Sequence, residues 1–507
     1  MPDRQQQAAA GRRIVRRPFP FNAPPLRRAR LSTDSMTARP AFPSPDAPGT
    51  PAPRSSARVL RRAAFVLGAA VLGYGAFAIA CPARTPAAIG DVVADWTGAN
   101  PHPVVLQRPA AQPLSAVAQL GRALFADPSL SASGKQSCAS CHSPDHAYGP
   151  PNGLDVQPGG LAMTQQGYRP PPSLMYLYRQ PNFSIGPDAG ENDAAPSVAQ
   201  QAASAAGVVK AQKVAGTSAA PQLVPQGGMF WDGRADTLQQ QAFGPLLNPV
   251  EMANAGIDDV ARKLAQSSHR AQFEQLFGAR VFSSAQLLVS EAMFAIARYQ
   301  VEDPSFHPYN SRYDRWLEGR ARLTQAELRG LRLFNDPDKA NCAGCHLSKP
   351  GKDGLPPMLT DYQYEALGAP RNQALAQNRN PAFHDLGVCG PFREDLKDQT
   401  QYCGMFLTPT LRNAATRRVF FHNGVFHTLD QVMAFYNERS ISPQKFYSRG
   451  ADGKVDVYDD IPPKYRANVD VTDAPFDRKP GDKPAMTAQD IKDIVAFLGT
   501  LTDEPAR

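Results

Sequence analysis

Apolar residues recur at helical spacing along much of the chain, whereas few segments alternate polar and apolar positions as strands do. Two short amphipathic helices are expected from apolar residues three or four positions apart: Leu114, Val117, Leu120 and Leu124, then Leu328, Leu331 and Phe334. Residues 255–301 form a longer helical stretch, and another helix begins near Thr428. A helix over 487–501 has Thr487 as N-cap and one apolar face: Ile491, Ile494, Val495 and Leu498. The pattern predicts a mainly α fold.

The two short helices belong to an internal repeat. Residues 121–128 read GRALFADP and precede CASCH at 138–142, and residues 330–337 read GLRLFNDP and precede CAGCH at 342–346. In each copy the helix ends at Asp-Pro, and a loop then leads into Cys-x-x-Cys-His. Duplication of one helical unit explains this repeat. It predicts two helical domains in tandem, 113–310 and 311–507.

Three other segments differ in composition from the two predicted domains. Residues 81–112 are rich in proline and alanine and are expected to be a linker. Residues from about 184 to 224 are rich in Ala, Ser and Gln and have little to bury, so they are interpreted as a surface insertion in the first domain. Residues 347–408 show no regular period and are expected to be irregular.

The N-terminal 62 residues hold 13 arginines against three aspartates, and an apolar stretch of 18 residues follows over 63–80. Arginines before an apolar run stay on the cytoplasmic side, which predicts export of the rest of the chain to the periplasm. Residues 63–80 are either a cleaved signal peptide or an inner-membrane anchor, and Cys81 is a candidate for lipid modification. Met36 is an alternative start.

The formal net charge of +8 does not indicate a nucleic-acid partner. The first 62 residues alone carry about +10, so the remainder is close to neutral. Because the basic charge is confined to this tail, no partner of this class is expected for the folded part of the chain.

Cys-x-x-Cys-His is the attachment signature of c-type haem, in which two thiols bind the vinyl groups and the histidine binds iron. A zinc site or a redox dithiol is the alternative, but neither explains why histidine follows both second cysteines. The sequence therefore predicts two haems, attached through Cys138, Cys141, Cys342 and Cys345, with His142 and His346 as iron ligands. Cys389 and Cys403 are expected to form a disulfide, with two buried free thiols as the alternative.

A block between the haem motifs holds FWDGRA at 230–235 and NPVEM at 248–252. Taken alone, Trp231 would be a core aromatic residue and Glu251 a solvated or capping carboxylate. Together with the paired haem motifs, the spacing of Trp231, Gln241, Pro245 and Glu251 resembles that in bacterial di-haem cytochrome c peroxidases and MauG proteins. The resemblance covers roughly residues 113–503.

This resemblance implies roles for the four residues of the block. Trp231 would lie between the haems and assist electron transfer, Glu251 would be the acid–base catalyst at the first haem, and Gln241 and Pro245 would line the same site. Many members of the family close the first haem with a histidine from the loop after the first motif. Here no histidine lies between His146 and His269, so the first haem is expected to have an open or water-bound face.

The resemblance also implies a distal ligand for the second haem. Residues 408–413 (TPTLRN) and 420–424 (FFHNG) match a family stretch, and the following helix places Tyr436 where most members have methionine and MauG has tyrosine. The alternatives are Met433, or neither residue. His422 and His427 are expected to be structural.

Calcium is the usual ion between the domains in this family, and the resemblance leaves it open here. Arg169-Pro170-Pro171 stands where the family has an asparagine ligand, and Arg417 and Val419 replace the residues that usually supply carbonyl ligands.

The sequence thus suggests a peroxidase that reduces hydrogen peroxide through high-valent haem intermediates, with electrons from a small c-type cytochrome or a cupredoxin. A MauG-like oxidation of residues on a partner protein is the first alternative, and a di-haem electron-transfer protein without peroxide chemistry is the second. The oligomeric state stays open, with a homodimer as one option.

Overall fold

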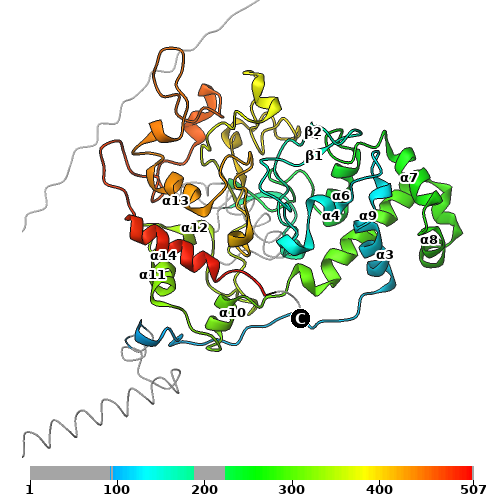
Figure 1. The fold of residues 1–507 in the computed structure, drawn as a ribbon, viewed down its shortest axis with the longest axis horizontal. Helices are drawn as coiled ribbons and strands as arrows, with labels where there is room; N and C mark the ends of the chain where they lie inside the picture. The colour runs from blue at the N-terminus through cyan, green and yellow to red at the C-terminus, as the bar shows by residue number, and fades with distance from the viewer. Residues whose placement is uncertain (1–91, 93–94, 188–222, 505–507) are drawn as a thin grey trace, which may run out of the picture. The chain divides into compact units, whose positions relative to one another are not determined.

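The computed structural model describes residue 92 and residues 95–187 and 223–504, and these residues are mainly helical, as the sequence predicts (Figure 1). The helices are α3 (Ala116–Phe125), α4 (Cys138–Cys141), α6 (Leu238–Leu247), α7 (Ile257–Gln266), α8 (Arg270–Phe277), α9 (Ala285–Glu302), α10 (Arg312–Leu317), α11 (Gln325–Phe334), α12 (Cys342–Cys345), α13 (Leu429–Glu438) and α14 (Ala488–Gly499). The arginine-rich tail, the apolar stretch 63–80 and most of the insertion at 184–224 lie outside the described residues. None of the helices in the described part is long and apolar enough to span a membrane.

Strands are short and pair only as two-stranded antiparallel sheets in the described residues. The pairs are β1 (Pro158–Gly159) with β2 (Gln165–Gln166), β3 (Ser184–Pro187) with β4 (Leu223–Gln226), and β5 (Tyr364–Glu365) with β6 (Phe406–Leu407). The β3–β4 pair joins the two ends of the predicted insertion, because Ser184 is opposite Gln226 and Pro187 is opposite Leu223. The insertion therefore begins and ends at one place on the fold.

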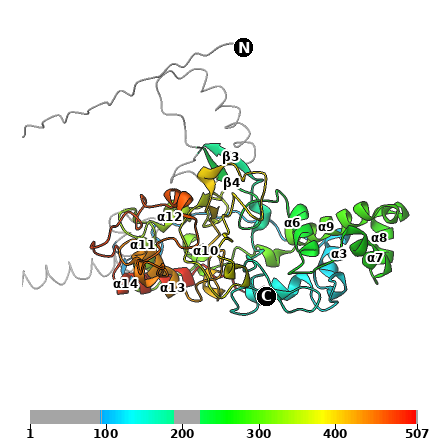
Figure 2. The ribbon, with the colours of Figure 1, turned by 90° about the horizontal axis from the view of Figure 1, so that it is seen from above.

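The first half of the described chain builds its core around α9. Helices α3, α6 and α7 pack against α9, and Figure 2 shows them gathered with α8. The helix begins at Ser284, whose hydroxyl accepts a hydrogen bond from the Leu287 amide. The helical stretch expected over 255–301 consists of α7, α8 and α9, which are separated at Ser267 and at Gly278, whose φ of +76° ends α8.

The second half of the described chain repeats this arrangement with α11 packed on α14. Both helices begin with a capping box, formed by Thr324 with Glu327 and by Thr487 with Asp490. The predicted apolar face of α14 is confirmed, since Ile494 and Leu498 are buried and Ile491 and Val495 pack against the same core. Phe497 is also fully buried there.

A glycine at the same place in both repeats lets the helices cross closely. A Cβ at Gly121 in α3 would overlap the carbonyl oxygen of Ala295 in α9, and a Cβ at Gly330 in α11 would overlap that of Asp493 in α14. Glycine is therefore required by backbone contact at both positions, not by backbone conformation. This equivalent contact supports duplication of one helical unit.

Part of the predicted linker is packed against the second half of the chain. The Asn100 side chain donates to the carbonyl of Leu317 (3.1 Å), and Arg108 forms an ion pair with Glu318 (2.6 Å). Leu106 belongs to the same core as α11 and α14. Residues 97–108 thus run along α10 before the chain enters α3.

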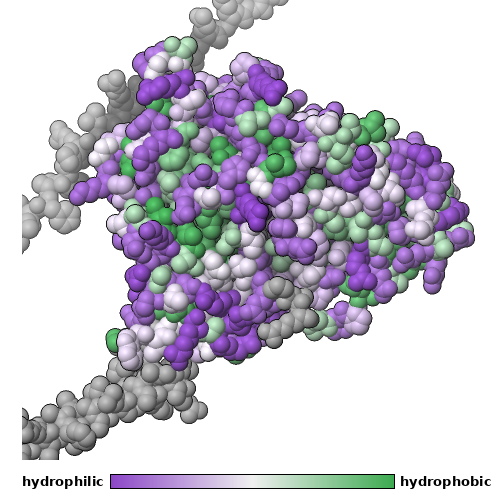
Figure 3. All heavy atoms as spheres, in the orientation of Figure 1, coloured by the Kyte–Doolittle hydropathy of each residue, from purple (hydrophilic) through white to green (hydrophobic). Residues whose placement is uncertain are grey.

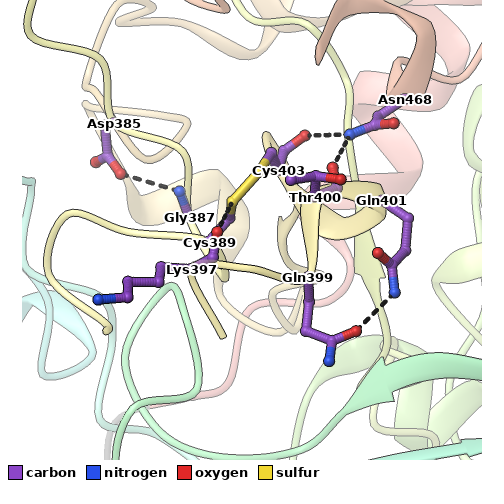
Figure 4. The surroundings of a disulfide bond; sticks show 9 residues. All are labelled: Asp385, Gly387, Cys389, Lys397, Gln399, Thr400, Gln401, Cys403 and Asn468. Carbon is purple, nitrogen blue, oxygen red and sulfur yellow. Dashed lines mark hydrogen bonds between the residues drawn. A yellow bond between two sulfur atoms is a disulfide. The ribbon is translucent and has the colours of Figure 1, made fainter. Parts of the chain in front are cut away.

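The expected disulfide is confirmed: Cys389 and Cys403 are bonded, and both are buried (Figure 4). Their surroundings are held by backbone contacts, since the Asn468 side chain donates to the carbonyls of Thr400 (2.8 Å) and Cys403 (3.0 Å). The bond closes a loop within the irregular region after the second motif, a region that has few regular hydrogen bonds of its own.

We expect Gly330→Ala to destabilise the protein by about 3 kcal/mol, because the added methyl group must force α11 away from α14. Gly499→Ala is the matched control, since a Cβ there meets nothing within 4 Å and the helix gains propensity, so it should change stability by less than about 1 kcal/mol. Denaturant unfolding of the haem-loaded proteins, followed by circular dichroism, measures both. Equal stability of the two variants would contradict the close crossing.

Candidate functional site

Both histidines of the repeated motifs are held in the same way. The Nδ1 atom of His142 lies 3.1 Å from the carbonyl oxygen of Tyr148, and that of His346 lies 3.0 Å from the carbonyl oxygen of Leu359. Because a carbonyl only accepts, Nδ1 carries the proton in each ring and Nε2 keeps its lone pair. Burial lowers the pKa of both imidazoles to about 4, so both are neutral. Each histidine is thus prepared to bind a metal through Nε2.

The residues that accept these hydrogen bonds share an unusual backbone conformation. Tyr148 has φ of +51° and Leu359 has φ of +56°, in the left-handed region that few non-glycine residues adopt. Both side chains are buried. The sequence analysis missed these two residues, because their role is carried by backbone atoms and no side-chain pattern marks it.

The four cysteines of the motifs form two separate pairs. Each pair lies on a one-turn helix, α4 or α12, so its two sulfur atoms are a turn apart. Cys138 packs against the core of the first half and Cys342 against that of the second. The pairs therefore do not join into one four-cysteine zinc site. Burial raises the pKa of the Cys138 and Cys342 thiols to about 12, which disfavours the thiolate that a reactive dithiol needs.

A cavity of about 510 Å³ lies beside the second motif. Cys342, Cys345 and His346 line it, together with residues from distant parts of the sequence: Trp231, Gln241, Arg417, Met433 and Tyr436. Its wall is mostly apolar, as expected of a site for a planar macrocycle. Thiols, a neutral histidine and an apolar cavity together fit a covalently attached haem. Figure 3 shows apolar residues at the surface over α12 and α13, two elements that line this cavity.

Helix α13 brings both predicted distal ligands, Tyr436 and Met433, to this cavity. Met433 is part of the hydrophobic core around α11 and α14. The Tyr436 ring packs on Phe421 and Phe476, and its hydroxyl forms no hydrogen bond with the described residues. Burial and the nearby Cys345 raise the pKa of this hydroxyl. Tyr436 therefore presents a polar group that the protein itself does not satisfy.

The loop after α6 positions Glu251 near the first motif. The Asn248 side chain donates to the Glu251 carboxylate (2.7 Å), and the Glu251 carbonyl accepts from the Gly160 amide (2.8 Å). Burial raises the pKa of Glu251, while the Arg234 guanidinium and the Asn248 hydrogen bond oppose that rise. The carboxylate is close enough to Cys141 to raise the pKa of that thiol. A carboxyl with a raised pKa beside a haem-binding motif can hold and release a proton.

The other residues of the predicted block lie around this loop. Gln241 is buried in α6 and lines the cavity, whereas Pro245 lies inside α6 and is not among the residues that line it. The carbonyl of Pro245 accepts from the Met252 amide (3.1 Å) and so holds the loop that carries Glu251. Asn248 was not singled out from the sequence, although its spacing three residues before Glu251 allows this contact.

Trp231 is fixed by two hydrogen bonds to separate parts of the chain. Its indole N–H donates to the carbonyl of Pro170 (3.1 Å), and its own carbonyl accepts from the Leu407 amide (3.0 Å). Its position on the cavity wall brings it alongside the second motif.

Most other described histidines have partners of their own. His146 bonds Ser143 (3.1 Å), His269 bonds Asp127 (3.1 Å), and His427 bonds Asp155 (3.1 Å). His422 lines the cavity and is stacked on Phe406 with ring centres 3.5 Å apart, and its buried Nε2 makes no hydrogen bond with the described residues and lies 3.5 Å from the Asp460 carboxylate. The structural role expected for His422 therefore stays a prediction, whereas the Asp155 partner of His427 supports such a role there.

The residues present fit a calcium ion poorly at the place where the resemblance puts one, because Arg169-Pro170-Pro171 supplies no asparagine side chain there. Arg169 forms ion pairs with Asp385 (2.7 Å) and Asp232 (2.8 Å), so both carboxylates are already used by a guanidinium. Over the described part of the chain, no three acidic, histidine or cysteine side chains gather to hold a metal. Calcium takes six to eight oxygen ligands from carboxylates, amide and backbone carbonyls and waters.

Glu365, an acidic residue that lines the cavity, was also missed from the sequence. Burial raises its pKa to about 7, and the carboxylates of Asp470 and Asp473 add to that rise. It lines the cavity with Tyr436. Its position in an irregular region gave no pattern from which to predict it.

Comparison with known proteins identifies the family of this chain. Residues 115–322 match the family model described as di-haem cytochrome c peroxidase. The chain is 32% identical over 400 residues to the methylamine utilization protein MauG of Paracoccus denitrificans, covering 76% of this chain and 89% of that protein. It is 28% identical over 332 residues to the cytochrome c551 peroxidase of Nitrosomonas europaea, covering 64% and 75%.

A solved structure shows the same fold. The diheme peroxidase BthA from Burkholderia thailandensis superposes with a TM-score of 0.65 and 37% identity, over 78% of this chain and 87% of that one. The chain therefore belongs to the family of di-haem cytochrome c peroxidases and MauG proteins, oxidoreductases that carry two c-type haems.

Proposed function

We propose that this protein reduces hydrogen peroxide to water with electrons from an exported redox protein. The observation that carries the proposal is the difference between the two motifs. The first motif has a carboxylate with a raised pKa, Glu251, as its neighbour. The second has Tyr436 and Met433 in its cavity. One haem would then keep an open face for the oxidant, while the other would be held by protein ligands on both faces.

Glu251 is proposed as the acid–base catalyst. Its carboxylate would accept a proton from the near oxygen of hydrogen peroxide and deliver it to the far oxygen, which leaves as water. Asn248 donates to Oε1 (2.7 Å) and so orients the carboxylate. Arg234 favours the charged form, and burial keeps the pKa above that of a free glutamate. Gln241 and Pro245 are proposed to shape this site. When bound, the haem iron supplies the redox centre that passes electrons to peroxide.

Tyr436 is proposed as the distal ligand of the second haem, with Met433 as the alternative. The Tyr436 hydroxyl has no hydrogen-bond partner among the described residues, whereas Met433 belongs to a packed core. A tyrosinate ligand stabilises oxidised iron more than a thioether does. Trp231, fixed at both its indole and its backbone, is proposed to lie between the haems and assist electron transfer.

The domain and location assignments are also proposals. Residues 113–310 and 311–507 are proposed as tandem cytochrome c-like domains, which the two hydrophobic cores support, one within 120–309 and one within 313–501 together with Leu106 from the preceding segment. The disulfide and the haem motifs support a periplasmic location, with residues 63–80 as signal or anchor. A small c-type cytochrome or a cupredoxin is the proposed electron donor.

A second candidate function is MauG-like oxidation of residues on a partner protein. The presence of Tyr436 in the cavity favours it, because the predicted ligand is the one that MauG carries. The identity of 32% to the Paracoccus protein over 89% of its length adds support. The two functions differ in whether a reduced redox protein is consumed.

The holoenzyme should oxidise reduced cytochrome c rapidly and continuously when hydrogen peroxide is added. Glu251→Gln should lower kcat/KM for peroxide by about 10²–10⁴-fold, because the proton relay is lost. Glu274→Gln is the control, since Glu274 is exposed on α8. Stopped-flow absorbance of the cytochrome measures the rates. Fast reaction of the enzyme with peroxide but no turnover of cytochrome c or a cupredoxin would favour the MauG-like function instead.

The rate of the peroxide reaction should fall as pH decreases through the pKa of Glu251, since only the carboxylate can accept the proton. Because burial raises the pKa of Glu251, the midpoint of this decrease in rate should lie above about pH 4.3, the pKa of a free glutamate. Arg234→Gln removes the charge that favours the carboxylate and should move the fall to higher pH. Arg262→Gln, on the exposed surface of α7, should not move it. A profile unaffected by both Glu251→Gln and Arg234→Gln would rule out this role.

The oxidised protein should give one high-spin and one low-spin haem signal in low-temperature EPR. Tyr436→Phe should abolish the low-spin signal or change its g values, and Tyr436→Met should raise the reduction potential of that haem by on the order of 100 mV. Met433→Leu, three residues earlier on α13, should leave the signal unchanged. The opposite result, a change in Met433→Leu and none in Tyr436→Phe, would assign the ligand to Met433.

A further inference from the structure

Arg417 is a partly buried arginine whose hydrogen bonds within the described residues go to backbone carbonyls. It follows the short 3-10 helix Ala414–Thr416, and its Nη2 lies 3.3 Å from the carbonyl oxygen of Pro171. Its Nε lies 3.5 Å from the carbonyl oxygen of Val419, at the long limit of a hydrogen bond. A Cβ added to Gly149 would be 3.8 Å from its Nη1. The guanidinium therefore sits among the backbone segments at 149, 171 and 419.

Among the described residues, no carboxylate pairs with this guanidinium. Arg417 forms no ion pair with the described residues, whereas the buried arginines Arg169 and Arg412 each pair with aspartates. Burial alone lowers the pKa of Arg417 to about 10, so it stays charged at neutral pH. A buried charge without a counter-ion is costly unless dipoles surround it. Here the dipoles are carbonyl groups, the kind of ligand that a calcium ion would also use.

The carbonyls of Pro171 and Val419 belong to two different segments of the site, and Arg417 contacts both. Pro171 precedes Pro172 and lies in the segment beside His142, whose pKa is lowered in part by the charge of Arg417. Val419 lies in the segment that leads to α13, the helix of Tyr436. Arg417 thus connects the surroundings of the first motif to the segment that carries the proposed ligand of the second.

A calcium ion at this place would meet a guanidinium in addition to the carbonyls. Arg169-Pro170-Pro171 stands where the family has its asparagine ligand, and the Arg169 guanidinium holds the aspartates Asp232 and Asp385. Arg417 itself occupies a position from which the family supplies a carbonyl. The Arg417 charge therefore lies among the carbonyls that a divalent cation would coordinate.

We propose that the Arg417 guanidinium is a permanent, covalently built-in cation that takes the place of the family's calcium ion. It joins the carbonyls of Pro171 and Val419 through N–H groups, where the ion would join carbonyls by coordination. The protein consequently needs no calcium to assemble the two haem sites, and its stability and haem spectra do not respond to calcium.

The first test uses the di-haem protein as purified without chelators. Elemental analysis should find two irons per chain and only trace calcium. The thermal unfolding midpoint and the low-temperature EPR spectrum should be the same after dialysis against EGTA and after addition of calcium chloride. One calcium per chain, or a midpoint or spectrum that EGTA changes and calcium restores, would overturn the proposal.

The second test compares two neighbouring arginines. Arg417→Gln removes the charge and should lower the unfolding midpoint by roughly 5 °C or more. Arg418→Gln, exposed at the next position, should leave it unchanged. If Arg417→Gln proved as stable as Arg418→Gln, the guanidinium would not be the connecting cation. Because the chelator test needs no variant, the proposal can be overturned even if Arg417→Gln fails to fold.

Discussion

The hydrogen bond from each histidine Nδ1 to a backbone carbonyl is the constraint on which the rest of the site depends. It fixes the proton on Nδ1 and so leaves Nε2 free to bind iron. The carbonyl must point back at the imidazole, and this requires Tyr148 and Leu359 to adopt a left-handed backbone. Such a conformation persists only where surrounding contacts hold it. Both residues are held by their own side chains: Tyr148 stacks on Phe306 with ring centres 3.7 Å apart, and Leu359 is 1% exposed in the second core.

The two repeats share this histidine–carbonyl contact, but different residues lie near each motif. In both halves a glycine allows the helix before the motif to cross a later helix closely, Gly121 on α9 and Gly330 on α14. The environments around the two motifs nevertheless differ, because Glu251 comes from a loop after α6 and Tyr436 from helix α13. A carboxylate with a raised pKa suits proton transfer, and a phenol without a hydrogen-bond partner suits ligation of iron. Two copies of one scaffold can therefore carry two different roles.

The sequence predicted what depends on local pattern. The helices, the start of one near Thr428, the cap at Thr487, the haem motifs and the disulfide follow from spacing and residue type, and the structure agrees with them. It did not predict the residues whose role is a backbone carbonyl, as at Tyr148 and Leu359, because any side chain can accompany such an atom. It treated residues 81–112 only as a linker, although Leu106 contributes to the second core. Apolar residues there are too few to form a period, so their packing depends on tertiary contacts.

Buried ion pairs between distant segments explain how the parts of the site keep their positions. Arg169 joins Asp385 and Asp232, and Asp232 follows Trp231 directly in the sequence. Such pairs add little net stability, because desolvation offsets their attraction, but breaking one leaves an uncompensated charge and costs several kcal/mol. They therefore act mainly by excluding alternative arrangements. Trp231 is itself fixed at two points, because its indole N–H donates to Pro170 and its backbone carbonyl accepts from Leu407. A ring fixed in this way would suit the electron-transfer role proposed for Trp231, because the role requires a constant position.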